Sequence, residues 1–153
     1  MQLRIPAIKV KATIEYVGLT RGGAMDVPKK DLNVAWFSLG PRPGEIGSAV
    51  IAGHYSWRNH GEGGIFRNLD KLRKGDMLYI RDDKGKSLSF IVRDNRLYDF
   101  DEGAGEIFSP NDGNYLNLIT CAGTWNSYQR SSTKRRVVFA ELVQQIVDIA
   151  GPS

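Results

Sequence analysis

The chain has 153 residues, of which 41% are hydrophobic and 25% are charged. This is the length and composition of one globular domain, and it excludes a disordered or collagen-like chain. A single cysteine excludes an internal disulfide framework and every multi-cysteine zinc or iron–sulfur site. The formal net charge of +4 is mild, so a solvated surface is the simplest interpretation of the basic residues. No apolar run approaches the roughly 18 residues that a membrane-spanning helix needs.

Apolar and polar residues alternate along much of the chain, which is typical of half-buried strands. The clearest case is Ile8–Tyr16, where every even-numbered residue is apolar. Further strands are predicted at Ser48–Ala52, Met77–Arg81, Ser87–Val92, Tyr115–Cys121 and Arg136–Val143. Turn-forming residues separate these strands, and Asp82–Gly85 has the composition of a hairpin turn.

One short segment has the spacing of a helix. Its apolar residues Ile65, Phe66, Leu69 and Leu72 recur at helical intervals, and Gly75 ends the segment. With many short strands and one or two small helices, the chain is predicted to be mainly β, a single barrel or sandwich.

Cys121 ends an apolar strand and is followed at once by Ala122 and Gly123. A nucleophile at a strand end is held rigidly and can still be reached by a substrate. Free cysteine is also among the most buried residue types, so an inert core residue is the alternative interpretation. Taken alone, this cysteine favours the inert role.

His54 shifts the interpretation of Cys121 towards a nucleophile. It also follows a short apolar strand and a glycine, Gly53. A cysteine and a histidine at two similar strand ends can supply a thiolate nucleophile and a proton donor, provided that the fold brings them together. His60 lies in the glycine-rich run 59–64, which is typical of a mobile loop.

Acyl transfer also needs a group that stabilises developing negative charge on oxygen. Arg135 and Arg136 open the last predicted strand. Adjacent strand residues face opposite sides, so only one of the two can reach a site that includes Cys121. The other is then a surface cation.

These residues resemble the sortases, the cysteine transpeptidases of Gram-positive cell surfaces. The resemblance runs from Ile5 to Val143 and rests on an ordered set of segments: Ile5–Ile8, Ile51–His54, Gly64–Leu72, Leu116–Cys121 and Arg135–Ala140. The family pattern has an arginine five residues before an alanine in the last strand, which selects Arg135. The Asp26–Pro28 segment, Trp36 and Phe37 are most similar to classes D to F, with a preference for class F.

The resemblance implies an eight-stranded sortase-type β-barrel with one catalytic domain over 1–153, a core at about 5–143 and a short C-terminal extension at 144–153. Sortases cleave a Leu-Pro-X-Thr-Gly-type sorting signal between Thr and Gly. Cys121 would attack the Thr carbonyl, His54 would exchange protons with the departing and incoming amines, and Arg135 would hold the peptide or the oxyanion. Thr120 is a candidate substrate contact. No cofactor or metal is implied.

The same resemblance implies the partners and the location. The donor is the sorting signal of a secreted surface protein, and the acceptor is an amine of peptidoglycan or of a pilin. Sortases are normally tethered by an N-terminal membrane segment, so this chain is expected to be the soluble domain of a protein on the outer face of the membrane. No nucleic acid is expected as a partner.

Two other functions compete with this hypothesis. A Cys–His peptidase would use the same residue types, but such enzymes usually place the cysteine before the histidine, and here His54 comes first. A non-catalytic basic barrel could bind nucleic acid through the Lys and Arg residues of 71–96, with Tyr79 and Phe90 as stacking platforms. A metal site is weaker still, because His54, His60 and one cysteine have no recognised ligand spacing.

Overall fold

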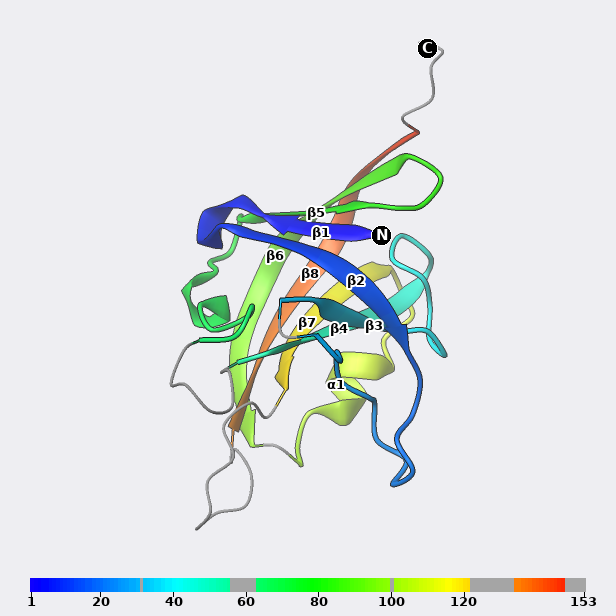
Figure 1. Ribbon diagram of the computed structural model, residues 1–153. Helices are drawn as coiled ribbons and strands as arrows, with labels where there is room; N and C mark the ends of the chain where they lie inside the picture. Colours follow the sequence, from blue (N-terminus) through cyan, green and yellow to red (C-terminus); the bar gives the residue numbers. More distant parts are fainter. Residues whose placement is uncertain (31, 56–62, 100, 122–133, 148–153) are drawn as a thin grey trace.

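The protein was analysed as a computed structural model, which describes residues 1–30, 32–55, 63–99, 101–121 and 134–147. Within these residues, eight strands close into a barrel in the order β1-β2-β3-β4-β7-β8-β6-β5 (Figure 1). The strands are β1 Gln2–Ile5, β2 Val10–Val17, β3 Val34–Phe37, β4 Gly47–His54, β5 Met77–Arg81, β6 Lys86–Asp99, β7 Asn114–Cys121 and β8 Lys134–Val147. The helical elements of the same residues are the α-helix α1 Ala104–Phe108 and the 3-10 turns η1 Pro6–Ile8 and η2 Leu69–Lys71.

The barrel mixes two kinds of strand pairing. β2 pairs with β3 and β4 pairs with β7 in parallel, and the remaining neighbours are antiparallel. A parallel pair needs a long crossover connection. The chain between β4 and β7 supplies it with β5, β6 and α1, so two strands distant in sequence run side by side and end together.

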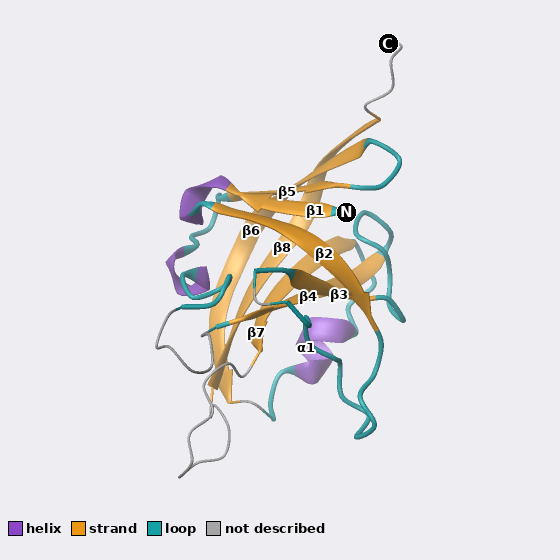
Figure 2. Ribbon diagram, in the orientation of Figure 1, coloured by secondary structure: helices purple, strands orange, loops and turns teal. Residues whose placement is uncertain are grey.

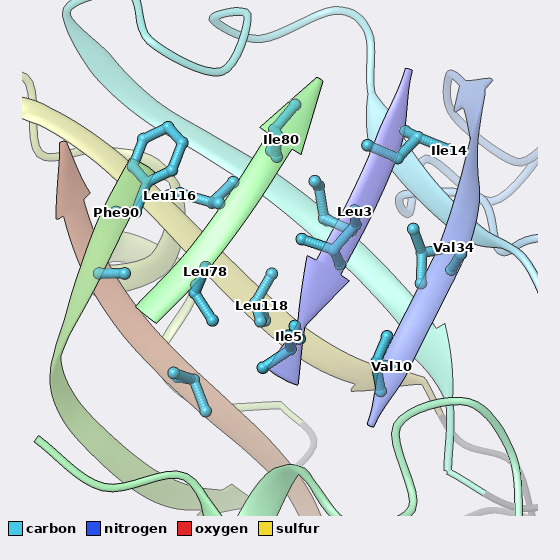
Figure 3. Packing of buried hydrophobic residues seen from close by; sticks show 14 of the residues in the cluster. Leu3, Ile5, Val10, Ile14, Val34, Leu78, Ile80, Phe90, Leu116 and Leu118 are labelled. Carbon is cyan, nitrogen blue, oxygen red and sulfur yellow. The ribbon is translucent and has the colours of Figure 1, made fainter. Parts of the chain in front are cut away.

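Alternate residues of the strands point into the barrel, and their apolar side chains fill its interior. Figure 3 shows this packing for Leu3, Ile5, Val10, Ile14, Val34, Leu78, Ile80, Phe90, Leu116 and Leu118. Phe66 and Leu69, from the segment after β4, are fully buried against the same cluster. Removing this apolar surface from water is the main contribution to folding.

A second apolar cluster lies outside the barrel, on the face of the sheet that packs against α1. Figure 2 shows α1 lying next to β4. The cluster consists of Val50, Ala52, Ile107, Ile119, Val137 and Phe139. The side chain of Asn117 fastens the helix to β7, since its Nδ2 donates to the Ile107 carbonyl at 2.8 Å. Strands β4 and β7 are therefore buried on both faces, which explains why apolar residues of both strands point to both sides of the sheet.

The six strands predicted from the sequence are confirmed, and so is the Asp82–Gly85 hairpin turn between β5 and β6. The helix predicted over 65–72 is wrong, because this segment forms a turn followed by η2. The strands β1 and β3, with four residues each, and the helix α1, with five, were not predicted from the sequence.

β8 continues through Val147, so the predicted C-terminal extension 144–153 begins inside a barrel strand. Its first four residues pair with β6, and Val147 stands opposite Lys86. Among the described residues, no helix is long and apolar enough to cross a membrane.

Candidate active site

Strands β4 and β7 end side by side, and their ends carry the predicted histidine and cysteine. The parallel register pairs Gly47 with Asn114 and continues without interruption to its last pair, His54 with Cys121. Because paired residues of neighbouring strands lie on the same face of a sheet, the fold brings these two positions together. The structure describes the backbone of Cys121, and its side chain lies outside the described part.

The face that carries this pair is the one covered by α1. His54 comes two residues after Ala52 in β4, and Cys121 comes two residues after Ile119 in β7. Ala52 and Ile119 belong to the cluster under α1. The His54–Cys121 pair therefore extends that row of residues beyond the edge of the apolar cluster.

The chain fixes the backbone of His54 through close packing with the segment that follows it. The Phe66 N–H donates to the His54 carbonyl at 3.0 Å. A Cβ at Gly53 would come within 2.6 Å of Phe66 Cδ2, and a Cβ at Gly64 would collide with the His54 carbonyl oxygen. Glycine at both positions permits this close approach.

The imidazole of His54 is half-buried, and its Nε2 lies 2.9 Å from the carbonyl oxygen of Pro28. A carbonyl oxygen can only accept, so Nε2 carries the hydrogen in this contact. Pro28 belongs to the connection between β2 and β3. Its contact with His54 was not predicted, although the Asp26–Pro28 segment was singled out for its resemblance to some sortase classes.

Arg135 lies at the start of β8, on the same face as the His54–Cys121 pair. The register of β7 with β8 pairs Ile119 with Val137, and two more residues of this register would set Arg135 opposite Cys121. Its Nη2 donates to the Glu102 carbonyl at 2.8 Å. Its Nε is buried and has no hydrogen-bond partner among the described residues. Burial lowers the pKa of Arg135 below its ordinary value, yet an arginine remains a cation at neutral pH.

Arg136 faces the other side of β8, as strand alternation predicts. Its Nη1 donates to Asn95 Oδ1 at 3.3 Å, and its backbone N–H donates to Thr120 Oγ1 at 2.8 Å. Thr120 is 4% exposed. The two neighbouring arginines thus have different surroundings, and Arg135 shares a face with His54.

A groove of about 590 Å³ runs along the outer face of these strands. One wall comes from the β2–β3 connection, the other from α1, and the floor from β3, β4, β7 and β8. The lining residues are Leu19, Gly23, Ala24, Met25, Asp26, Val27, Phe37, Ala52, Ala104, Phe108, Ile119, Thr120, Lys134 and Arg135. Most of them are apolar, and the cations Lys134 and Arg135 stand where β8 begins. An extended peptide with apolar side chains fits this lining.

A second hollow, of about 320 Å³, lies near the same strand ends. It is lined by Tyr55, Phe66, Leu69, Asp70, Leu97, Thr120, Lys134 and Arg136. Thr120 and Lys134 border both hollows. Arg135 lines only the groove, and Arg136 lines only the second hollow.

The remaining candidate residues either lie elsewhere in the fold or fall outside the described part of the chain. His60 lies outside the described residues. Phe90, expected as a stacking platform in a nucleic-acid-binding barrel, is fully buried in the core, and Tyr79 is covered by the Arg4 guanidinium at 4.7 Å from its ring centre. In the described part of the chain, no group of three or more His, Cys, Asp or Glu residues is arranged to hold a metal.

Comparison with known proteins gives a family match and a set of similar folds. The family described as Sortase domain matches residues 3–143. Sortase C-3 from Streptococcus pneumoniae is 25% identical with a TM-score of 0.71, over 96% of this chain and 64% of that chain. Sortase C from Clostridium perfringens is 26% identical with a TM-score of 0.66, over 94% of this chain and 68% of that chain.

A sortase E mutant from Streptomyces avermitilis has the same fold at 18% identity, with a TM-score of 0.70 over 99% of this chain and 93% of that chain. No curated protein matches the chain significantly. The chain spans just under two thirds of the length of the pneumococcal structure.

Proposed function

The chain belongs to the sortase family, and on this premise we propose that it is a cysteine transpeptidase with Cys121 as nucleophile, His54 as acid and base, and Arg135 as the cation at the reacting oxygen. Its substrate in this proposal is a Leu-Pro-X-Thr-Gly-type sorting signal, cut between Thr and Gly. The observation that carries the proposal is the last register pair of β4 and β7, His54 with Cys121, next to Arg135 on the same face.

The first half of the reaction would release the Gly-containing fragment. The Cys121 thiol gives its proton to His54, and the resulting thiolate attacks the Thr carbonyl carbon, whose oxygen becomes an oxyanion. The C–N bond to Gly then breaks as His54 gives a proton to the leaving nitrogen, and a thioester remains on Cys121. Each of the two steps has a lower barrier than direct aminolysis of the peptide bond.

The second half would join the thioester to an acceptor amine. The amine attacks the thioester carbon, His54 takes the proton from the attacking nitrogen, and the Cys121 sulfur leaves as a thiolate. The new bond is an amide, so the peptide bond energy is conserved and no cofactor is needed. An amine of peptidoglycan or of a pilin is the proposed acceptor.

Two groove residues would hold the substrate. The Arg135 Nε, which has no partner among the described residues, would donate to a peptide carbonyl or to the oxyanion. The Thr120 hydroxyl accepts from Arg136, and its own hydrogen can be donated to a substrate carbonyl.

The proposed location is the outer face of the cell membrane, where sorting signals and cell-wall amines meet. Residues 1–153 are proposed to act as one catalytic domain of a membrane-anchored protein. The assignment to classes D to F, with a preference for F, stays a prediction.

A peptide-library assay with and without an added amine tests the function. Products read by mass spectrometry should show cleavage after Thr and, when triglycine is present, a new product in which triglycine replaces the Gly fragment. Hydrolysis that never incorporates the amine would favour the Cys–His peptidase alternative. No cleavage of any library member would contradict both enzymes.

A further inference from the structure

Glu15, in the middle of β2, holds the connection that covers His54. Its carboxylate accepts three hydrogen bonds: from the Lys29 N–H at 3.0 Å, from the Lys30 N–H at 3.1 Å, and from Asn33 Nδ2 at 3.1 Å. Adjacent backbone N–H groups that converge on one carboxylate fix the local path of the chain. The side chain of Glu15 thus anchors the end of the connection that leads into β3.

The peptide group between Pro28 and Lys29 makes contacts on both of its sides. Its N–H, on Lys29, donates to Glu15, and its C=O, on Pro28, accepts from His54 Nε2 at 2.9 Å. None of the described peptide bonds is cis, so the N–H and C=O of this planar group point in opposite directions. Glu15, one peptide group and His54 therefore form a continuous chain of hydrogen bonds.

The burial of Pro28 between exposed neighbours supports a specific role for its hydrogen bond with His54. Pro28 is buried, whereas its neighbours Val27 and Lys29 are exposed. Burial raises the pKa of Glu15, but the hydrogen bonds from Lys29, Lys30 and Asn33 outweigh it, so the pKa lies below its ordinary value. Glu15 is then an anion at neutral pH and polarises the peptide that it holds.

Hydrogen bonds in a chain strengthen one another. A carboxylate that accepts the Lys29 N–H makes the Pro28 carbonyl a better acceptor. That carbonyl selects the ring tautomer of His54 with hydrogen on Nε2, and it also favours the orientation in which Nδ1 points away from Pro28. A carboxylate that orients a catalytic histidine usually contacts the ring directly. Here the contact passes through one peptide group.

We propose that Glu15 is a positioning residue for His54, acting through the Pro28–Lys29 peptide. This inference rests on the proposed function in one respect, the role of His54 as acid and base. The hydrogen-bond chain itself can be tested without any turnover.

The direct test is the tautomer of His54, measured by nitrogen NMR of the imidazole. The chain has two histidines, so His60→Gln leaves His54 as the sole signal. In this background the ring should carry its hydrogen on Nε2. Glu15→Ala should give a mixture of both tautomers, and Glu15→Gln, which keeps one acceptor but no charge, should give an intermediate result.

Steady-state kinetics give a second readout. In Glu15→Ala, kcat should fall on the order of 10- to 100-fold, because small displacements of a reacting group are costly. KM for the peptide should stay within about 3-fold, since the groove wall at 19–25 is held by its own contacts, the Leu19–Met25 bridge and the Thr20 N–H to Ala24 carbonyl bond. Asn33→Ala removes one of the three bonds to Glu15 and should have a smaller effect on kcat.

The matched control is Glu45, whose carboxylate accepts the Arg42 N–H at 2.8 Å in a turn before β4, at the opposite end of that strand from His54. Glu45→Ala should change neither the tautomer nor kcat. An unchanged tautomer in folded Glu15→Ala or Glu15→Gln would overturn the inference. If the wild type shows no transpeptidation, the proposed function fails, and the tautomer comparison still decides the role of Glu15.

Discussion

His54 and Cys121 form the last register pair of the parallel strands β4 and β7. The crossover through β5, β6 and α1 brings together two residues that are far apart in the sequence. Arg135, the second residue of the neighbouring strand β8, lies on the same face. Three strand ends thus carry a histidine, a cysteine and an arginine on one face of the sheet, which is the arrangement that the proposed acyl transfer needs.

Cys121 is the only thiol of the chain, so alkylation provides a simple test of the nucleophile. A thiol-directed alkylating agent should add one mass increment to the wild type and abolish transpeptidation. Cys121→Ala should be inactive and gain no increment, with an unchanged melting temperature. Full activity in Cys121→Ala would disprove the proposed mechanism.

Substitution of the two histidines by alanine should have very different effects on kcat. His54→Ala should lose about 10²- to 10⁴-fold in kcat, because a general acid and base contributes this much. His60→Ala should stay within a few-fold of the wild type in the same peptide assay. The reverse ranking would mean that the wrong histidine has been assigned.

Arg135 and Arg136 are a matched pair on opposite faces of β8. A lysine cannot reproduce the directed donors of a guanidinium, so Arg135→Lys should lose on the order of 10²- to 10³-fold in kcat. Arg136→Lys should remain near the wild type in kcat, and thermal unfolding should show that both variants are folded. If Arg136→Lys loses activity and Arg135→Lys keeps it, the reacting oxygen lies on the other face of β8.

Gly53 should be intolerant of any side chain. A Cβ there would meet Phe66 Cδ2 at 2.6 Å, and Phe66 is fully buried, so Gly53→Ala should lower the free energy of unfolding by about 1–3 kcal/mol in urea titrations. Gly105 in α1 is the control, because a Cβ there has no neighbour within 4 Å. Gly105→Ala should be neutral or stabilise by up to about 1 kcal/mol. Equal effects at both sites would contradict the packing described here.

The hydrogen bonds to Glu15 predict a specific pH dependence of stability. Its pKa is lower in the folded state than the ordinary value of 4.5, so its contribution is present above that pH and is lost as the pH falls through the folded-state pKa. Glu15→Gln should therefore be less stable than the wild type at pH 7, with a smaller difference at about pH 3. Urea titrations at both pH values measure it. A difference that stays constant would show that the charge of Glu15 does not matter.

Much of the fold follows from local patterns in the sequence. Alternation predicted the strands whose one face meets the core, and two apolar strand ends indicated His54 and Cys121. The short elements β1, β3 and α1 were not predicted, because none of them is long enough to show a clear period. The helical spacing at 65–72 was misleading, since Phe66 and Leu69 are buried by tertiary packing rather than by a helix face.

The link from Glu15 to His54 could not be predicted from the sequence. It depends on the orientation of one peptide group in the long connection between β2 and β3, and nothing in the local residue pattern determines that orientation. Alternation predicted only that Arg135 and Arg136 face opposite sides of the strand, and the family resemblance selected Arg135. The register of β7 with β8 then shows which face each arginine occupies.

The central claim is that Cys121 forms a thioester with the Thr carbonyl of a sorting signal. Intact-mass spectrometry of the protein, mixed with a Leu-Pro-X-Thr-Gly peptide and no amine, measures this directly. The account predicts a mass increment equal to the peptide up to Thr, carried on Cys121 in the digested protein, lost on addition of triglycine and absent in Cys121→Ala. Cleavage of the peptide at the same rate by Cys121→Ala, or an acyl group found on another residue, would contradict it.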